Sequence, residues 1–278
     1  VAVQPGQKVQ AGEKLAVIEA MKMENILFAA QDGVVGKIVA GKGEALAVPV
    51  SNINPYLVDA PDLVLEKRNQ PICIVPTISY GSMANDDGHL LLDKEQRNAL
   101  IAAEPATAPY IRRYMGAQEF LNNAERWCLW LKDISPSLMR SSNELRHRIE
   151  AVRKFRASSN REATRNLAAT PSLFGEDRQP LKSYLLLPKV SSENRPYMPI
   201  GFMPSEVIAN GSALTISDSG HYEMGVLQSK MHMAWMRAVA GRMKSDYQYS
   251  AQIVYNNFPW PDIPEKLEPN QPQTPTHK

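Results

Sequence analysis

The stretch that decides the fold runs from residue 184 to residue 217 and reads YLLLPKVSSENRPYMPIGFMPSEVIANGSALTIS. It alternates short apolar runs with turn residues such as Pro, Gly, Asn and Ser. Apolar runs of this length between turn signals are typical of short β-strands. The stretch therefore predicts a small sheet, with strands drawn from the apolar runs Tyr184–Leu187, Met198–Phe202, Val207–Ala209 and Leu214–Ile216.

On both sides of this stretch the sequence contains helical patterns as well as further strands. A mixture of helices and small sheets along one chain predicts an α+β fold, with mixed small sheets and packed helices. The elements that we expect are a helix over 94–103 capped by Asp93, a short helix over 108–115, a strand over 127–131, a helix over 138–157 with Leu145, Ile149, Val152 and Phe155 on one side, and a Met-rich helix over 222–243 that bends near Gly225.

Residues 1–48 differ from the rest of the chain. Short β-branched runs alternate there with turns such as Pro5-Gly6 and Asp32-Gly33, which predicts a small all-β unit. The composition changes at a seam near Pro49. We therefore divide the chain into an all-β segment over 1–48, a larger domain over 49–262 and a tail over 263–278, rich in Pro, Gln, Glu and Thr, that we expect to be disordered.

The hexapeptide Glu19-Ala20-Met21-Lys22-Met23-Glu24 resembles the attachment hairpin of biotinyl carrier domains. In that family the central lysine receives biotin through an amide, so the resemblance implies biotin attachment at Lys22 and a biotin ligase as partner. The family's flattened barrel needs one strand before Val1 and another after Val48. We therefore expect a truncated, partial all-β half-barrel, and two interpretations stay open: a biotin carrier segment of an acyl-CoA or pyruvate carboxylase, and an inactive fusion remnant.

A second set of motifs occurs in order along the larger domain: Asp59–Asp62, Ile111–Tyr114, Arg126–Leu131, Arg161–Arg165, Pro188–Arg195, Lys244–Tyr247 and Tyr255–Pro261. Together they resemble the target-recognition and C-terminal region of MmeI-like DNA methyltransferases. These are single-chain restriction-modification enzymes whose full form methylates adenine. The resemblance covers about three quarters of the chain and implies double-stranded DNA as the partner and sequence-specific recognition as the function.

Glu193 and Arg195 are the candidate base-reading residues. They lie two residues apart, so in an extended segment both side chains point to one face. A carboxylate can accept a hydrogen bond from cytosine N4, and a guanidinium can donate to guanine O6 and N7, so the pair can read a C·G base pair. A Glu-x-Arg pair in this segment resembles the family's base reader. The alternative is a surface ion pair, which would contribute little.

Residues 140–165 form a local basic stripe, because they hold eight Lys or Arg residues and three acidic ones, whereas the whole chain is near balance at 31 to 29. Such a stripe can neutralise DNA phosphates, although a solvated helix face is the alternative. Arg161 and Arg165 are four residues apart, on one face of a helix, which suits them to bracket a backbone. The phosphate contacts that we expect, within the stripe and the family motifs, are made by Arg153, Arg156, Arg161, Arg165, Lys189 and Lys244.

The motifs of the full enzyme's chemistry are not visible after the seam. A methyltransferase of this class needs a glycine-rich loop for S-adenosylmethionine and an Asn-Pro-Pro-Tyr motif for the adenine, and a nuclease needs a carboxylate and lysine cluster. We therefore expect no catalytic residue and no metal in this chain. S-adenosylmethionine is expected to bind a methyltransferase domain of the parent protein, which would be a partner of this one.

Cysteine spacing and hydropathy indicate the compartment. Cys73 and Cys128 lie far apart without Cys-x-x-Cys spacing, which fits a reducing environment. The sequence has no apolar run near 18 residues and no signal-peptide pattern. We therefore expect a cytoplasmic protein with no membrane partner.

Overall fold

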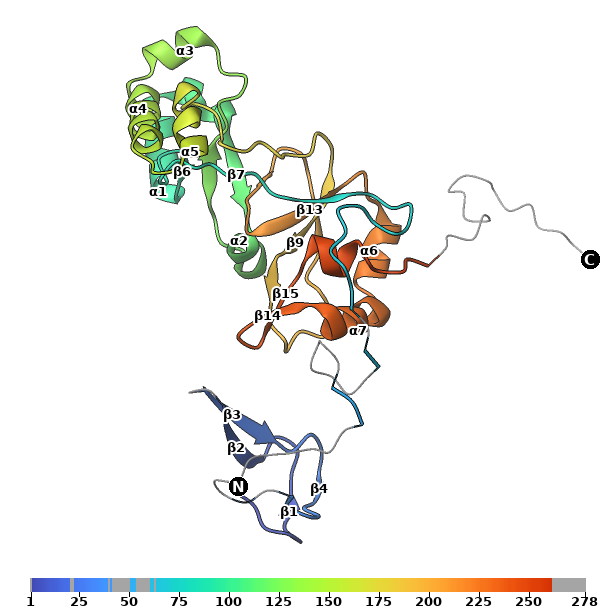
Figure 1. The fold of residues 1–278 in the computed structure, drawn as a ribbon. Helices are drawn as coiled ribbons and strands as arrows, with labels where there is room; N and C mark the ends of the chain where they lie inside the picture. The colour runs from blue at the N-terminus through green and yellow to red at the C-terminus, as the bar shows by residue number, and fades with distance from the viewer. Residues whose placement is uncertain are drawn as a thin grey trace, which may run out of the picture. The chain divides into compact units, whose positions relative to one another are not determined.

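The computed structural model divides the chain into two units, Val1–Asp62 and Leu63–Lys278 (Figure 1). The seam near Pro49 and the tail over 263–278 both lie outside the described residues. The residues that the structure describes are 2–20, 23–39, 41, 51–53, 61–62 and 64–261.

The first unit is a small all-β structure, as the sequence predicts. β1 (Lys8–Val9) pairs antiparallel with β4 (Gly33–Val34), and β2 (Lys14–Ala20) pairs antiparallel with β3 (Met23–Phe28). Gly6, before β1, and Gly12, between β1 and β2, lie in turns with φ near +85°, a conformation that glycine adopts without steric cost. The described residues bury a small apolar cluster of Val3, Val9 and Ala29, with Leu15 and Val35 packed against it.

A four-stranded antiparallel sheet forms the centre of the second unit, with the strand order β11-β9-β13-β5. β9 (Tyr184–Pro188) and β13 (Ala213–Ser217) are its middle strands, and every residue of β9 is buried. β5 (Ile78–Tyr80) and β11 (Gly201–Met203) lie at its edges. The prediction of a small sheet over 184–217 is therefore confirmed for the runs at β9, β11 and β13.

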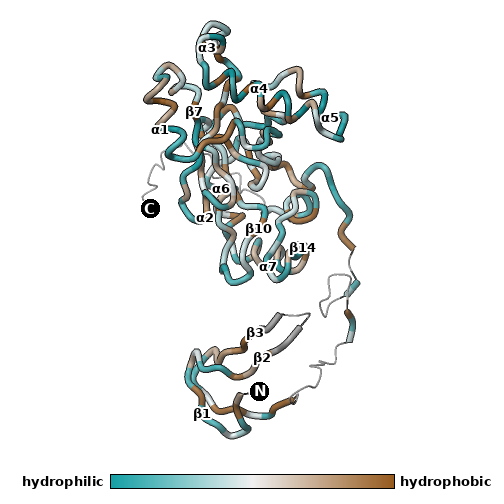
Figure 2. The backbone as a smooth tube through the Cα atoms, turned by 90° about the vertical axis from the view of Figure 1, so that its left-hand side faces the viewer, coloured by the Kyte–Doolittle hydropathy of each residue, from teal (hydrophilic) through white to brown (hydrophobic). Residues whose placement is uncertain are grey.

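A second four-stranded sheet has the order β12-β7-β8-β6. β7 (Ile111–Met115) pairs antiparallel with β8 (Trp127–Leu129) and parallel with β12 (Ile208–Ala209), while β6 (Leu91–Leu92) pairs with β8. The apolar run over 207–209 thus contributes to this second sheet and links it to the first. Figure 1 shows two lobes, with α3, α4 and α5 on one and α6 and α7 on the other, and in Figure 2 hydrophobic stretches run through the middle of this unit.

A third, three-stranded antiparallel sheet has the order β10-β15-β14. It joins β10 (Val190–Ser191), which follows the central strand β9, to a hairpin made by β14 (Gly241–Met243) and β15 (Asp246–Gln248). The helices and single turns around the three sheets are α1 (Lys94–Ala103), η1 (Pro105–Tyr110), α2 (Ala117–Asn122), α3 (Pro136–Ser141), α4 (Asn143–Ala157), α5 (Glu162–Asn166), η2 (Leu167–Ala169), α6 (His221–Leu227), α7 (Lys230–Val239) and the π-helical turn η3 (Ala251–Tyr255).

Three predicted helices differ from the structure. The segment 108–115 is the end of η1 followed by strand β7, because pairing with β8 and β12 outweighs its local helical pattern. The segment 138–157 is interrupted at Ser142, which caps α4 by accepting a hydrogen bond from Leu145 N. The segment 222–243 breaks between α6 and α7 and not at Gly225, and its last residues form β14.

The family motif over 255–261 has a structural role. Asn257 Nδ2 donates to the carbonyl oxygens of Glu66 (3.1 Å) and Gln252 (3.0 Å), and Asn257 Oδ1 accepts from Arg68 Nε at 3.0 Å. Asn256 Nδ2 donates to Arg68 O at 2.7 Å. These two amides therefore fasten the segment around Arg68 to the C-terminal end of the described chain.

His232 lies in the core beside Tyr249 and Phe258 and gives a first testable prediction. Its side chain has no exposed surface, its Nε2 lies 2.9 Å from Tyr249 Oη, and burial lowers its pKa from 6.5 to about 4. The unfolded chain therefore takes up the proton first as the pH falls. We expect the free energy of unfolding to fall by about 3 kcal/mol between pH 6.5 and pH 4 on account of His232 alone.

Urea denaturation at pH 7.5 and pH 4.5 measures this effect. His232→Gln should lose most of the pH dependence in this window, whereas the exposed His147→Gln on α4 should keep the parent's dependence. Equal dependence in the parent and in His232→Gln would contradict the prediction.

Candidate nucleic-acid interface

The predicted base-reading pair lies in a turn directly after β10. Arg195 N donates to Ser192 O at 3.2 Å, and Asn194 N donates to Ser192 Oγ at 3.3 Å. Glu193 and Arg195 are thus the second and fourth residues of a β-turn, and the expectation of an extended segment with both side chains on one face is wrong. Glu193 remains exposed, with 43% of its side-chain surface accessible.

The hairpin of β14 and β15 brings a third predicted residue to the same end of the sheet. Ser191 pairs with Tyr247, and Met243 pairs with Asp246, so the strands end side by side at the turn over 192–195 and at the loop Lys244-Ser245. Lys244 is exposed at the tip of the hairpin and has a φ of 57°. The structure therefore brings Glu193, Arg195 and Lys244 to one end of the third sheet; we call this end the sheet tip.

Arg242 also lies at the sheet tip and was not predicted. Its guanidinium carbon lies 3.9 Å from the centroid of the Tyr247 ring, its Nη1 donates to Ser245 O at 3.0 Å, and the same Nη1 lies 4.0 Å from Glu193 Oε2. The sequence gives little reason to select Arg242, because its segment is predicted as the end of a helix. Within the sequence its only signal is its place two residues before Lys244, in the same family-matching hairpin.

Lys189 lies at the other end of β10 from the turn. Its Nζ is 5.4 Å from the centroid of the Tyr80 ring, and its side chain is half-buried. Its backbone is fixed on both sides, because Lys189 N donates to Ser212 O at 3.1 Å and Lys189 O accepts from Tyr249 N at 2.8 Å. Lys189 is therefore held in place, but the structure does not bring it to the sheet tip.

Arg156 is not a phosphate ligand, and this prediction is wrong. The residue has no exposed surface, and burial lowers the pKa of its guanidinium while the charge of Asp86 opposes that shift. All of its N–H groups are directed to backbone carbonyls, which leaves no donor for DNA. The acceptors are the oxygens of Asn85 (2.9 Å from Nε), Leu167 (3.0 Å from Nη1), Thr170 (2.9 Å from Nη1), Ala84 (2.8 Å from Nη2) and Leu173 (2.7 Å from Nη2).

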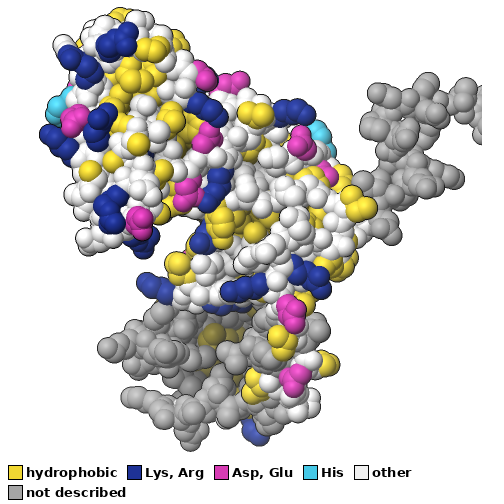
Figure 3. All heavy atoms as spheres, turned by 45° about the horizontal axis from the view of Figure 1, so that its top comes forward, with side chains coloured by type: hydrophobic (Ala, Val, Ile, Leu, Met, Phe, Trp, Pro, Cys, Tyr) yellow, Lys and Arg dark blue, Asp and Glu magenta, His cyan; other side chains and the backbone are white. Residues whose placement is uncertain are grey.

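The other predicted residues of the stripe are exposed. Arg153 lies on α4 with its Nε 3.6 Å from Glu150 Oε2. Arg161 directly precedes α5, and Arg165 in its last turn donates from Nη1 to Ser159 O at 3.0 Å. On the face drawn in Figure 3, Lys and Arg side chains of this lobe are scattered among Asp and Glu and do not form a continuous band. The exposed arginines remain candidates for phosphate contact.

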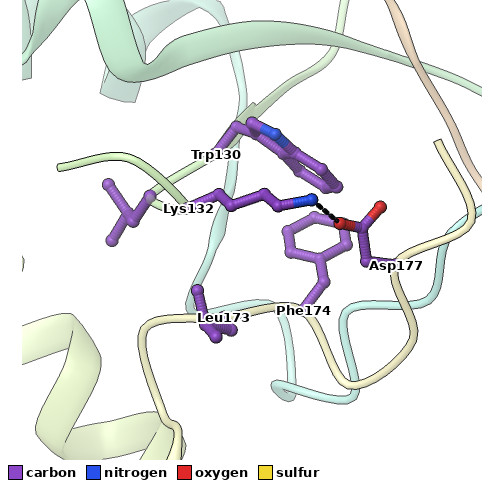
Figure 4. A pocket seen from close by; sticks show the side chains of 6 residues that line it. Trp130, Lys132, Leu173, Phe174 and Asp177 are labelled. Atoms are coloured by element: carbon purple, nitrogen blue, oxygen red, sulfur yellow. Dashed lines mark hydrogen bonds and ion pairs between the residues drawn. The ribbon is translucent and has the colours of Figure 1, made fainter. Parts of the chain in front are cut away.

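A small cavity of about 90 Å³ lies in the lobe that contains α3, α4 and α5 (Figure 4). The rings of Trp130 and Phe174 meet edge to face there with centroids 4.8 Å apart, and Lys132 Nζ donates to Asp177 at 2.7 Å across the opening. This ion pair raises the pKa of Lys132. Pockets that hold small molecules usually measure roughly 300 to 1,000 Å³, so we interpret the cavity as imperfect packing and not as a ligand site.

Neither a metal centre nor a membrane span is found in the ranges that the structure describes. No group of three or more His, Cys, Asp and Glu side chains there could hold a metal ion. No helix among those residues combines the length and the apolar character needed to cross a bilayer.

Known proteins match the chain in two places. For residues 1–53 the matching family model is described as "Biotin-requiring enzyme". A stretch of 46 residues, 16% of this chain, is 61% identical to the propionyl-CoA carboxylase alpha chain of Ruegeria pomeroyi and covers 7% of that protein. The first unit is therefore similar to part of a biotin-requiring enzyme.

For residues 59–262 the matching model is described as "MmeI, target recognition domain". DNA methyltransferase A of Bacillus subtilis (strain 168) is 37% identical over 214 residues, which are 77% of this chain and 24% of that protein. A solved structure of the type IIL restriction-modification enzyme MmeI in complex with DNA is 38% identical, with a TM-score of 0.78, over 91% of this chain and 35% of that one. The chain thus spans about a quarter to a third of the length of these two relatives. Because the model matches more than half of its residues, the chain belongs to the MmeI target recognition domain family.

Proposed function

We propose that the larger unit reads a base sequence in duplex DNA, as the target-recognition part of an MmeI-like adenine-specific methyltransferase. The observation that carries this proposal is the sheet tip, where exposed Glu193 and Lys244 come together with Arg195 from segments about 50 residues apart in the chain. The relative of known structure was solved in complex with DNA. Methyl transfer, with S-adenosylmethionine, would belong to a domain of the parent protein outside this chain.

The chemistry of the sheet tip suits the major groove, which is wide enough to admit a two-stranded β-ribbon. Glu193 would accept a hydrogen bond from cytosine N4, and Arg195 would donate to guanine O6 and N7, with each good contact contributing roughly 1 to 3 kcal/mol of discrimination. Glu193 and Arg195 belong to one four-residue turn, so both side chains leave the chain at the end of β10 and can reach the same short stretch of DNA.

Phosphate contacts would position the sheet tip on the duplex. We assign this role to the exposed candidates Arg153, Arg161, Arg165 and Lys244, and to half-buried Lys189, and we withdraw it from Arg156. Such contacts carry no base information by themselves, but they fix the register of the protein on the DNA.

Duplex binding that weakens steeply with salt is the expected result for the full chain. The logarithm of the binding constant falls linearly with the logarithm of the salt concentration. Removing one phosphate contact should make this fall less steep by about 0.9. Lys244→Gly is the cleanest variant, because glycine removes the charge and is compatible with the φ of 57° at this position. The measurement is a fluorescence-anisotropy titration of a labelled duplex at several salt concentrations.

Lys94→Ala is the matched control, since Lys94 is an exposed lysine on α1 that pairs with Glu125 and lies outside the sheet tip. Its slope should equal that of the parent chain. A folded chain that fails to retain DNA at low salt would contradict the proposed function.

We also propose that the first unit accepts biotin at Lys22, a residue that itself lies outside the described residues. The observations that favour it are the match to biotin-requiring enzymes over residues 1–53 and the antiparallel pairing of Ala20 with Met23 in β2 and β3. In the sequence, Met21-Lys22 stands between these two paired residues, which supports the interpretation of Glu19–Glu24 as an attachment hairpin. Biotin would supply the carboxyl-carrying group, and the chain would supply the lysine.

Coexpression with biotin ligase followed by a streptavidin blot tests this attachment. We expect a signal in the parent and in Lys14→Ala, and none in Lys22→Ala. An unlabelled parent would leave the first unit without a carrier role.

A further inference from the structure

Arg242 is the most firmly held exposed cation at the sheet tip. Its guanidinium lies 3.9 Å above the ring of Tyr247, which is itself only 5% exposed, and Nη1 donates to Ser245 O at 3.0 Å. A cation over the face of an aromatic ring is attracted by the ring's quadrupole. The ring and the carbonyl together therefore fix the guanidinium, although 41% of the Arg242 side chain stays accessible to solvent.

Strand pairing explains why Arg242 meets Glu193. Ser191, Tyr247 and Arg242 lie opposite one another across β10, β15 and β14, so their side chains leave the sheet on the same face. Glu193 follows Ser191 by two residues, just beyond the end of β10. Its Oε2 consequently comes within 4.0 Å of Arg242 Nη1, in an ion pair that joins the turn to the hairpin.

We propose that Arg242 is a positioning residue for Glu193, and that it orients this carboxylate for the base pair that Glu193 reads. The inference rests on the proposed function, because it assumes that the sheet tip contacts bases. The carboxylate keeps free lone pairs for cytosine N4, since a single long contact to Nη1 occupies only one side of it. Without Arg242, the exposed Glu193 side chain would sample several rotamers. Fixing it on the DNA would then cost conformational entropy, and its contact with cytosine would discriminate less strongly between base pairs.

The alternative is that Arg242 contacts a phosphate. A phosphate contact would contribute affinity but no base preference, and it would change the salt dependence. A positioning residue would instead change the preference at one base pair and leave the others as they are. The two roles are therefore separated by a specificity profile and not by affinity alone.

The test is a binding selection from a duplex library with a randomised central segment, performed with the full parent chain, Glu193→Ala, Arg242→Gln and Arg242→Lys. Glu193→Ala should lose the preference at one base pair. Arg242→Gln should lower the preference at that same base pair about fivefold or more, which corresponds to the lower end of the discrimination that one good base contact provides. Arg242→Lys, which keeps the charge but not the planar fork, should fall between Arg242→Gln and the parent. Thermal unfolding of each variant verifies that the fold is retained.

The possible outcomes separate the inference from the proposed function. If Glu193→Ala changes one position and Arg242→Gln changes none, or changes a different one, the positioning role is overturned while base reading by Glu193 stands. If Arg242→Gln binds all sequences more weakly by the same factor and its affinity depends less steeply on salt, the positioning role is overturned in favour of a phosphate contact. If Glu193→Ala leaves every preference unchanged, base reading by Glu193 fails and the inference falls with it.

Discussion

Replacement of Arg156 by leucine is expected to lower the free energy of unfolding of the larger unit by about 4 kcal/mol or more. The guanidinium is fully buried and donates to five backbone carbonyl oxygens between 2.7 and 3.0 Å away. Leucine fills part of the volume but supplies no donor, and each buried polar group left without a partner costs roughly 1 to 3 kcal/mol. The loss is large because one side chain ties α4 to two other segments, Ala84-Asn85 and 167–173.

Urea denaturation followed by tryptophan fluorescence measures this loss. Arg153→Leu is the matched control, because it lies on the same helix with 56% of its side chain exposed and should change the free energy of unfolding by about 0.5 kcal/mol or less. Arg156→Lys should be intermediate, since it keeps the charge and has three donors in place of five. A loss below about 1 kcal/mol in Arg156→Leu would contradict the structural role.

Arg156 also shows why a buried cation is hard to recognise in a sequence. Leu145, Ile149 and Val152 are buried on α4 as predicted, and Arg156 continues their spacing by one further turn. Phe155, which the prediction placed on that face, is 38% exposed. The position therefore signalled burial, but the residue type suggested a surface cation. What the sequence could not reveal is that carbonyls more than 70 residues away along the chain, at Ala84 and Asn85, would surround the guanidinium.

The parts of the fold that were predictable depend on local signals. The helix over 94–103 has the expected Asp93 cap, whose carboxylate accepts a hydrogen bond from Gln96 N. The strand β7 is predicted as a helix because its own residues do not show its pairing, with β8 on one side and with β12 on the other, whose Ile208 lies opposite Tyr114 from 94 residues away along the chain. The segment Ser192-Glu193-Asn194-Arg195 is a turn and not the extended segment that the base-reading hypothesis assumes, because Ser and Asn favour a turn before Pro196.

Of the residues at the sheet tip, Glu193, Arg195 and Lys244 were predictable from the sequence and Arg242 was not. The Glu-x-Arg pair could be selected from the sequence through its chemistry and its resemblance to a base reader. Arg242 could not, because its role depends on two pairings: that of β10 with β15, where Ser191 lies opposite Tyr247 from 56 residues away, and that of β15 with β14, in a segment predicted as the end of a helix. Long-range strand register is a property of the packed sheet, and local periodicity does not encode it.

Removing both members of the turn pair, with Glu193→Ala and Arg195→Ala, is expected to abolish the preference for one C·G base pair. Two good base contacts together provide about 2 to 6 kcal/mol of discrimination, and even the lower figure is about 30-fold. Preferences at other positions should persist, because the double substitution leaves the sheet and the phosphate-binding candidates intact. Asn194→Ala is the matched control, since Asn194 is an exposed residue of the same turn and its hydrogen bond to Ser192 Oγ is made by its backbone N–H, which alanine keeps.

The most direct measurement of the central claim is the set of sequences that the parent chain and this double variant select from a randomised duplex library. The account predicts a defined motif for the parent, the same motif for Asn194→Ala, and for the double variant a motif that has lost its preference at one C·G pair. An identical motif for the parent and a folded double variant would contradict base reading by the turn after β10.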